Sequence, residues 1–322
     1  MNRLSWAKVL GFVLTALAWV PAVPAASWPE KPIRIIVPWP PGGSTDVICR
    51  VLAADLTARF KQQVIIDNRA GAGSIVGLQI ATAAPPDGYT FMMTSTAYGF
   101  LIDKPKVPVD LVNSFVPVAM IGFGDAALVV HPSFPVNTVK ELIDLAKRKP
   151  QEIFYGSSGI GGFPHMNTEL FMMKTGTRMV HVPFKGGGPA MVDIMAGHIQ
   201  VYLGSLVQVM PQVQGKRLRL VATGGLQRNP KLHDVPTIAE TVPGYESRIW
   251  WGIFAPPRTP VDAIGRFHAE TTDAISAPAF QKRLDEQGGE VVKMSSAEFG
   301  RLMVSEQNKW LEVIRAAGIK GE

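Results

Sequence analysis

The stretch Ile33-Arg34-Ile35-Ile36-Val37-Pro38-Trp39-Pro40-Pro41-Gly42-Gly43-Ser44-Thr45-Asp46 passes from an apolar run to prolines and glycines, then to hydroxyl and acidic side chains. The apolar run is typical of a buried strand. Gly42 and Gly43 allow a sharp turn and a close approach of the backbone to a ligand, and Ser44 or Thr45 can cap a following helix. Because helix starts attract anions, the stretch is equally consistent with a plain capped turn and with an anion site.

The same order of strand, turn and helix recurs along the chain. Apolar runs of strand length alternate with segments of helical periodicity over residues 33–93 and again over residues 153–222. This alternation predicts an α/β fold with a mostly parallel sheet and helices on its faces. A long β-rich run over residues 115–130 is interrupted by the Gly-rich residues 122–125, and helical segments after residue 260 are expected to return to the first group.

These patterns predict two lobes with a ligand cleft between them. The first lobe would comprise residues 27–123 and 247–322, and the second lobe residues 124–246. The chain would cross between the lobes twice in extended conformation, near residues 122–125 and 245–251. These two β-strand crossings would act as a hinge.

Residues 1–26 have the pattern of a secretory signal peptide. Arg3 and Lys8 precede an uncharged apolar run, and small residues follow, so cleavage is expected after Ala25 or Ala26. A retained N-terminal anchor is the less favoured alternative. No other segment is long and apolar enough to cross a bilayer, and we therefore expect an exported protein.

Composition and motifs exclude several functions. The formal charge of +6 falls to +4 (6 − 2) without Arg3 and Lys8, which favours small anions slightly but indicates no nucleic-acid partner. The 6 histidines lack metal-ligand spacing, and the chain has neither a phosphate-binding loop nor a dinucleotide fingerprint. We therefore expect no metal and no cofactor. Cys49, the single cysteine, is expected to be a buried packing thiol.

Two further Gly-rich turns, at residues 156–165 and 184–190, follow predicted strands and open predicted helices. Hydroxyl residues at 94–96 end another strand. Repeated turns of this kind on both lobes predict capture of an anion that has two polar ends, or one anionic end and a flat body. Trp39 and Phe184 adjoin the turns and are expected to reach the cleft. An exported hydrolase with a Ser158–His165 pair stays open as an alternative.

Several motifs resemble those of the tripartite tricarboxylate transporter solute receptors, also called the Bordetella uptake gene (Bug) family. In chain order they are KPIRIIVP (31–38), PPGGSTD (40–46), DNRAGAG (67–73), PDGYT (86–90), YGSSG (155–159), HVPFKG (181–186), AGH (196–198), DVPTIAE (234–240) and WGIFAPP (251–257). They cover essentially all of the chain that would follow a signal peptide. The resemblance is specific for the family and much less so for the ligand.

The resemblance implies a periplasmic, two-lobed binding protein of the type II Venus-flytrap kind, and no enzyme. Such receptors capture a small-molecule carboxylate and deliver it to a membrane permease. The matching turns give the expected ligand-binding residues of the first lobe: Trp39, Pro41, Gly42, Gly43, Ser44, Thr45, Ser95 and Thr96. Those of the second lobe are Ser157, Ser158, Gly159, Gly161, Gly162, His165, Phe184, Lys185, Gly187, Ala190, Gly204 and Ser205.

One departure from the family bears on the ligand. Many relatives carry an acid where this chain has Gly204-Ser205, and an acid there suits ligands with an ammonium group. We hypothesise a bulkier ligand without an amine, an aromatic dicarboxylate such as terephthalate. An aliphatic di- or tricarboxylate such as citrate is the alternative, and Gly204 could equally serve packing. A monomer is the simplest expectation. The sequence is equally consistent with a receptor that delivers its ligand to a permease and with one that presents it to a membrane sensor.

Overall fold

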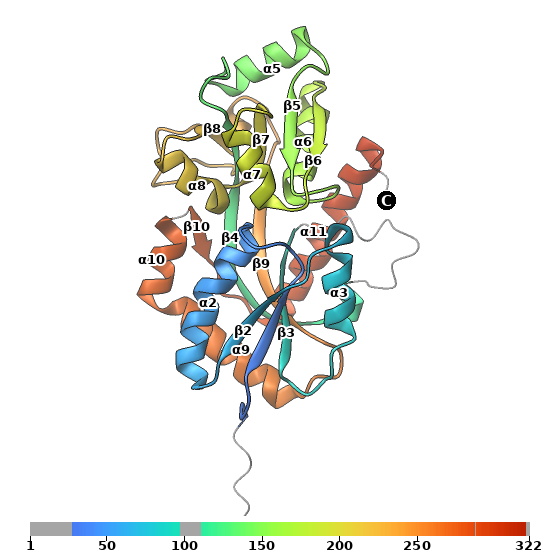
Figure 1. The fold of residues 1–322 in the computed structure, drawn as a ribbon, viewed down its shortest axis with the longest axis vertical. Helices are drawn as coiled ribbons and strands as arrows, with labels where there is room; N and C mark the ends of the chain where they lie inside the picture. Colours follow the sequence, from blue (N-terminus) through green and yellow to red (C-terminus); the bar gives the residue numbers. More distant parts are fainter. Residues whose placement is uncertain (1–27, 97–110, 287, 320–322) are drawn as a thin grey trace, which may run out of the picture.

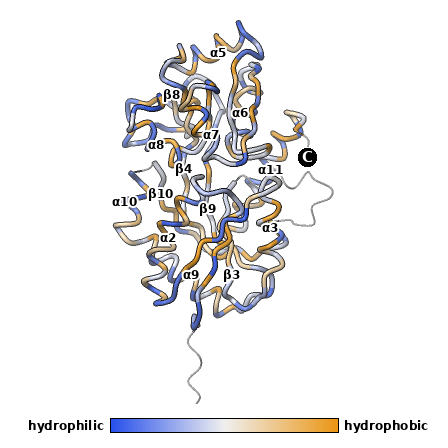
Figure 2. The backbone as a smooth tube through the Cα atoms, in the orientation of Figure 1, coloured by the Kyte–Doolittle hydropathy of each residue, from blue (hydrophilic) through white to orange (hydrophobic). Residues whose placement is uncertain are grey.

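The computed structural model describes residues 28–96, 111–286 and 288–319, and it has two lobes, one above the other in Figure 1. The predicted signal peptide lies outside the described residues. Within them, ten strands form one sheet in the order β2-β1-β3-β9-β4-β7-β5-β6, with β8 and β10 also paired to β4. In Figure 2 the helices alternate between hydrophobic and hydrophilic residues, as expected for helices packed on a sheet.

The first lobe is built around three parallel strands, β1 (Ile33–Val37), β2 (Val64–Asn68) and β3 (Thr90–Ser95). Helices α2 (Ser44–Phe60) and α3 (Ile75–Thr82) connect them, and a short 3-10 turn, η1 (Ala72–Ser74), leads into α3. Strand β1 ends at the opening stretch of the sequence, so the turn and the start of α2 lie at the carboxyl edge of the sheet. This edge is where α/β folds usually bind ligands.

Two long strands connect the lobes. Strand β4 (Val116–Val130) pairs antiparallel with β9 (Arg248–Ala255) up to Asp125, and then with β7 from Ala126 and with β8 from Ala127. The predicted interruption at residues 122–125 is wrong, because the strand continues through it. The two glycines allow close packing of neighbouring residues against the strand. A side chain at Gly122 would overlap Glu290 O at 2.1 Å, and one at Gly124 would overlap the Trp251 ring at 2.6 Å.

The sheet is mixed rather than mostly parallel as predicted. Its outer strands pair in parallel, whereas the central strands β4 and β9 pair antiparallel with their neighbours. The reason is that the chain passes between the lobes along these two strands, and a return crossing runs in the opposite direction. The alternation of strands and helices predicts an α/β fold, but it carries no information on the direction of the crossings.

The second lobe contains strands β5 (Phe154–Ser157), β6 (Val180–Pro183), β7 (Val201–Ser205) and β8 (Arg219–Thr223). Its helices are α5 (Val139–Arg148), α6 (Phe163–Thr175), α7 (Gly187–Met195) and α8 (Leu206–Gln214). Helix α8 was not predicted from the sequence, because Pro211 lies inside it. The buried residues Leu206, Val209 and Met210 hold α8 against the lobe.

After β9 the chain forms α9 (Val261–Ser276), α10 (Pro278–Glu286), the short strand β10 (Gly289–Val291) and α11 (Ser296–Ala317). Helices α9 and α10 pack on α2 in the first lobe, as expected. Helix α11 differs, because it packs on β4 and α4 (Leu111–Ser114) and also on α6 of the second lobe. None of the helices in the described part of the chain has both the length and the apolar character of a membrane span.

Candidate functional site

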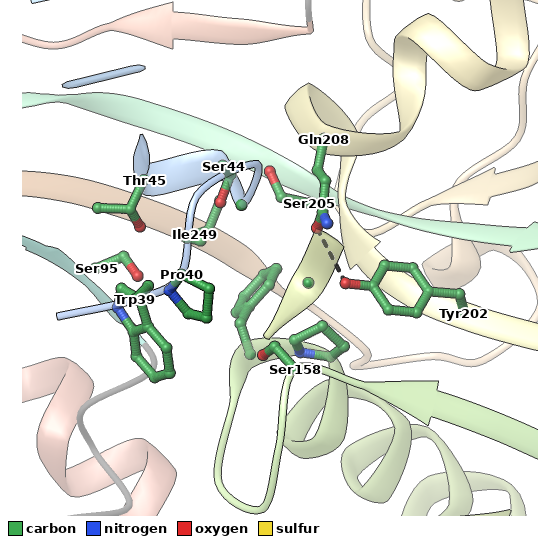
Figure 3. Close-up of a pocket in the computed structure, with 14 residues that line it drawn as sticks. Trp39, Pro40, Ser44, Thr45, Ser95, Ser158, Tyr202, Ser205, Gln208 and Ile249 are labelled. Atoms are coloured by element: carbon green, nitrogen blue, oxygen red, sulfur yellow. Dashed lines mark hydrogen bonds between the residues drawn. The ribbon is translucent and has the colours of Figure 1, made fainter. Parts of the chain in front are cut away.

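A small cavity lies between the two lobes, at the carboxyl edges of their strands (Figure 3). Its volume is about 40 Å³. A cavity that holds a single water has a volume of roughly 10–15 Å³. This cavity therefore has room for about three non-hydrogen atoms, the size of a carboxylate group. Its lining residues are Trp39, Pro40, Gly43, Ser44, Thr45, Ser95, Ser158, Phe163, Pro164, Gly187, Tyr202, Ser205, Gln208 and Ile249.

Four helices begin at this cavity, and each contributes residues of its first turn to the lining: α2, α6, α7 and α8. Their N-cap residues are Gly43, Gly162, Gly186 and Ser205, and none of the four makes a side-chain cap. Helices α5 and α11, which begin elsewhere, are capped by Thr138 and Ser295. Four starts without side-chain caps direct positive dipole ends and the N–H groups of their first turns, which Pro164 and Pro189 lack, toward one small space, an arrangement suited to an anion.

Side-chain donors face the same space. Trp39 Nε1, Ser205 Oγ and Gln208 Nε2 are buried and have no hydrogen-bond partner among the described residues. The amide of Gln208 is oriented by Tyr202, whose hydroxyl donates to Oε1 at 3.0 Å (Figure 3), and this leaves the NH₂ group free. Buried donors without partners are costly unless a ligand or water accepts from them. No described residue that lines the cavity is charged, so helix starts and neutral donors set its electrostatics.

Two glycines that were predicted to touch the ligand make room for this Tyr202–Gln208 pair. A side chain at Gly204 would overlap the Tyr202 ring at 2.1 Å, and one at Gly187 would overlap Gln208 Nε2 at 2.5 Å. The space beside Gly204 is therefore occupied by the Tyr202 ring. Gly187 itself also lines the cavity.

The turn before α2 is held by Asp46. Its carboxylate accepts hydrogen bonds from the Gly42 backbone N–H at 3.0 Å and from Arg50 Nε and Nη2, both at 2.9 Å. Asn68 Nδ2 donates both to Asp46 Oδ1 and to Trp39 O, each at 3.0 Å. Burial opposes ionisation of Asp46, but these hydrogen bonds outweigh it and lower its pKa. Gly42 adopts φ +84°, a conformation that favours glycine, so its place in the turn is structural.

A second, larger cavity adjoins the first and shares Trp39, Pro40 and Ser158 with it. Its volume is about 520 Å³. It is lined by Pro38, Trp39, Pro40, Ala70, Gly71, Gly73, Ser74, Ser158, Gly159, Ile160, Pro183, Phe184, Lys185 and Gly186. A ligand bound by one end in the small cavity can extend into this one.

The lobes touch around both cavities, and glycines form the contacts. A side chain at Gly188 would come within 3.2 Å of Pro41 O, and one at Gly186 within 2.5 Å of Pro40 Cγ. A side chain at Gly73 would likewise place its Cβ 3.5 Å from Ile160 O. The structure therefore represents a closed arrangement, in which the Gly-rich turns of one lobe meet those of the other.

His165 does not line either cavity. Its Nδ1 accepts from the Gly161 backbone N–H at 3.0 Å, its Nε2 lies 3.6 Å from Glu169 Oε1, and its ring stacks on His181 at 4.0 Å. The serine bound to a histidine is Ser157, whose Oγ lies 2.6 Å from His181 Nε2. Ser158 lines both cavities instead. The alternative Ser158–His165 catalytic pair therefore lacks the contact between base and nucleophile that it needs.

Several other predicted ligand-binding residues do not line the small cavity. Thr96 Oγ1 accepts from the Trp250 backbone N–H at 3.0 Å, and Ala190 is buried in the core of the second lobe. Phe184, Lys185 and Gly159 line only the larger cavity, and Gly161 and Gly162 shape the turn before α6. Cys49 is buried, as predicted, and burial raises the pKa of its thiol.

Sequence reasoning missed Pro40, Phe163, Pro164, Tyr202, Gln208 and Ile249 in the small cavity. Phe163 and Pro164 lie within the predicted turn at residues 156–165, although they were not predicted to touch the ligand. Tyr202 lies inside an apolar strand and Gln208 on the unpredicted helix α8, so neither carried a local signal.

A family model described as a tripartite tricarboxylate transporter family receptor matches residues 48–319. The chain belongs to this family. BugT of Bordetella pertussis is 30% identical to this receptor over 324 residues, which is 99% of this chain and 99% of BugT. A UPF0065 protein of Pseudomonas sp. is 33% identical over 293 residues, 89% of this chain and 87% of its own.

The receptor is also similar to solved structures. Rpa4515 of R. palustris, solved with adipate, superposes with a TM-score of 0.88 at 32% identity and covers 91% of this chain and 99% of its own. The family and these similarities establish a two-lobed periplasmic binding protein, and a receptor rather than an enzyme. The family implies a small-molecule carboxylate ligand and a membrane transporter as partner. Among the described residues, no group of three metal-ligating side chains comes together.

Proposed function

We propose that this receptor binds a dicarboxylate, with one carboxylate group in the small cavity between the lobes. The observation that carries the proposal is the convergence of four uncapped helix starts on a space of carboxylate size. Gln208 Nε2, Ser205 Oγ and Trp39 Nε1 add donors. A hydrogen bond to a charged group contributes roughly 1.5–3 kcal/mol. A handful of them, less the cost of association, gives micromolar affinity, about −8 kcal/mol.

The proposed ligand is an aromatic dicarboxylate such as terephthalate. The adjoining cavity is walled by Trp39, Phe184 and three prolines, flat apolar surfaces that suit a ring. No described residue that lines either cavity is acidic, so the site offers no carboxylate partner to the ammonium group of an amino acid.

An aliphatic dicarboxylate is the second candidate. A 32% identical structure of the same fold was solved with adipate, which carries two carboxylates on a flexible chain. The cavity of about 520 Å³ has room for either ligand. The two candidates differ because terephthalate has a ring that can stack against Trp39 and Phe184, whereas adipate has none.

We further propose that ligand binding and lobe closure are coupled. In this proposal residues 27–123 and 247–322 make up one lobe and residues 124–246 the other. The hinge lies near Asp125 and Arg248, because the partner of β4 changes there from β9 to β7. A ligand that touches α2 and α8 together favours the closed state. The closed monomer, exported with the help of residues 1–26, would then deliver the ligand to the membrane transporter.

The test is a thermal-shift screen of benzoate, terephthalate, adipate, citrate and aspartate, followed by calorimetry on every compound that raises the melting temperature. Terephthalate is expected to give the largest shift and a micromolar Kd. Tight binding of aspartate without binding of terephthalate or adipate would contradict the proposed ligand class.

A further inference from the structure

The turn between β5 and α6 contributes to both cavities, but two histidines outside the cavities hold it in place. Ser158 lines both cavities, and Phe163 and Pro164 line the small one. His165 and His181 line neither, and His165 is buried. The position of the turn, and of Ser158 with it, therefore depends on contacts that a ligand does not touch.

The hydrogen bonds of His165 define its protonation state in this arrangement. Its Nδ1 accepts from the Gly161 backbone N–H at 3.0 Å, which requires an Nδ1 without a proton. The proton of the neutral ring then lies on Nε2, 3.6 Å from Glu169 Oε1. A second proton would have to lie on Nδ1, where it would point at the Gly161 N–H. Protonation of His165 and the hydrogen bond from Gly161 therefore exclude each other.

His181 bonds to the same turn. Its ring stacks on that of His165 at 4.0 Å, and its Nε2 lies 2.6 Å from Ser157 Oγ. Ser157 Oγ also accepts from the Gly159 backbone N–H at 3.1 Å. A charge on one ring would oppose a charge on the other at this separation, so each histidine favours the neutral form of its neighbour.

The other titratable groups around the stack come from β5, α6 and α11. Tyr155 of β5 stacks on both rings and donates to Glu169 Oε1 at 2.7 Å. Burial opposes ionisation of Glu169, but hydrogen bonds from His165 and Tyr155 outweigh it and lower its pKa. Helix α11 packs on α6, but its buried Glu306 lies 3.9 Å from Lys309 of the same helix. Glu169 is thus the carboxylate that faces the stack.

We propose that His165 and His181 are positioning residues of the ligand site, and that a proton taken up by His165 competes with the ligand. This inference rests on the proposed function. Neutral His165 holds Gly161 and keeps Ser158 at the cavities, whereas protonated His165 releases the turn. The same turn carries Ile160 O, which a side chain at Gly73 of the first lobe would approach within 3.5 Å, so its release also loosens the closed arrangement.

Proton and ligand compete because they require different arrangements of the turn. The ligand-bound receptor excludes a proton from His165 Nδ1, and the ligand-free receptor, whose turn is free to move, accepts it below the ordinary histidine pKa of about 6.5. The ligand-free state then binds more protons than the bound state. Affinity from this group is therefore complete above that pH and decreases as the pH falls below it.

The experiment measures the Kd of terephthalate and adipate by calorimetry at about pH 7.5 and about pH 5, on either side of the ordinary histidine pKa. In His165→Asn, Oδ1 replaces Nδ1 as the acceptor and does not titrate, whereas His165→Leu has no acceptor. His233→Gln is the matched control, because the His233 side chain is 77% exposed in the same lobe. Protonation of the ligand itself affects every protein equally and cancels when they are compared. Melting temperatures at both pH values report folding.

Between the two pH values, the unmodified protein and His233→Gln are expected to lose at least roughly fivefold more affinity than His165→Asn does. At about pH 7.5, His165→Leu should bind at least roughly fivefold more weakly than His165→Asn, because its Gly161 N–H has no acceptor. Equal losses in the unmodified protein and His165→Asn would overturn the competition, and equal affinities of the Asn and Leu variants would overturn the positioning role. Either result leaves the proposed function intact.

A second measurement needs no variant. The histidine ring signals of the unmodified protein are followed by NMR over the same pH range, with and without saturating terephthalate. The signal of His165 should titrate in the free receptor and stay constant in the bound one. The same titration in both states would overturn the competition. Failure of the unmodified protein to bind either dicarboxylate at about pH 7.5 would instead overturn the proposed function.

Discussion

In the proposed ligand site, Gln208 offers a buried N–H donor to the small cavity. Tyr202 holds its Oε1, and its NH₂ group is left for the ligand. Gln208→Glu keeps the size of the side chain and the bond from Tyr202, but it replaces a donor by a carboxylate oxygen. We predict a loss of affinity of at least roughly 100-fold, about 3 kcal/mol, because one charged hydrogen bond is lost and a repulsion is added.

Calorimetry with terephthalate and adipate measures this change. Gln214→Glu is the control, since it adds the same charge at the exposed end of the same helix and should leave affinity within about twofold. Similar losses in both variants would mean that net charge, rather than the donor of Gln208, causes the effect.

The turn between β5 and α6 is stabilised by two stacked histidines, His165 and His181. His181 binds Ser157 Oγ, stacks on His165, and lies near Glu169 and Tyr155. Burial, followed by the neighbouring His165, lowers the pKa of His181 to about 4, although Glu169 opposes the shift. In an unfolded chain the pKa of histidine is about 6.5.

Between these two values the unfolded chain binds a proton at residue 181 that the folded chain does not. Stability from this group is therefore complete above pH 6.5 and is lost as the pH falls toward 4. We predict that the melting temperature falls in this window by a few degrees and that the fall is shallower in His181→Gln. Parallel curves for both proteins would show that other groups cause the acid sensitivity.

Local patterns predicted most elements but not the site as a whole. The apolar run and the turn that follows it located β1 and the first turn of α2 to within one or two residues. Helix α8 was not predicted because it contains Pro211, and proline usually ends a helix. What holds such a helix in place is packing against residues distant in sequence, which a local pattern does not show. Tyr202 and Gln208 were missed for the same reason: their pairing depends on the space left by Gly204 and Gly187, which is a property of the folded lobe.

The proposed closure of the two lobes would require close contact between their Gly-rich turns. The Cβ of an alanine at residue 188 would lie 3.2 Å from Pro41 O in the closed state, and it has no such neighbour once the lobes separate. We predict that Gly188→Ala lowers ligand affinity by roughly three- to tenfold, about 1 kcal/mol, and leaves the ligand-free protein as stable as before.

Gly265→Ala is the matched control, because a side chain there meets nothing within 4 Å on the exposed face of α9. It should leave the affinity unchanged. If Gly188→Ala binds terephthalate and adipate as tightly as the unmodified protein does, closure does not require the contact between Gly188 and Pro41.

In the proposed function, the cavity between the lobes recognises the negative charge of a carboxylate. Calorimetric titration with adipate, terephthalate and the uncharged adipamide tests it most directly, since adipamide has the length of adipate and lacks its charge. We predict micromolar binding of the two dicarboxylates and at least roughly 100-fold weaker binding of adipamide. Binding of adipamide as tight as that of adipate, or no binding of either dicarboxylate, would contradict recognition of carboxylate charge by this cavity.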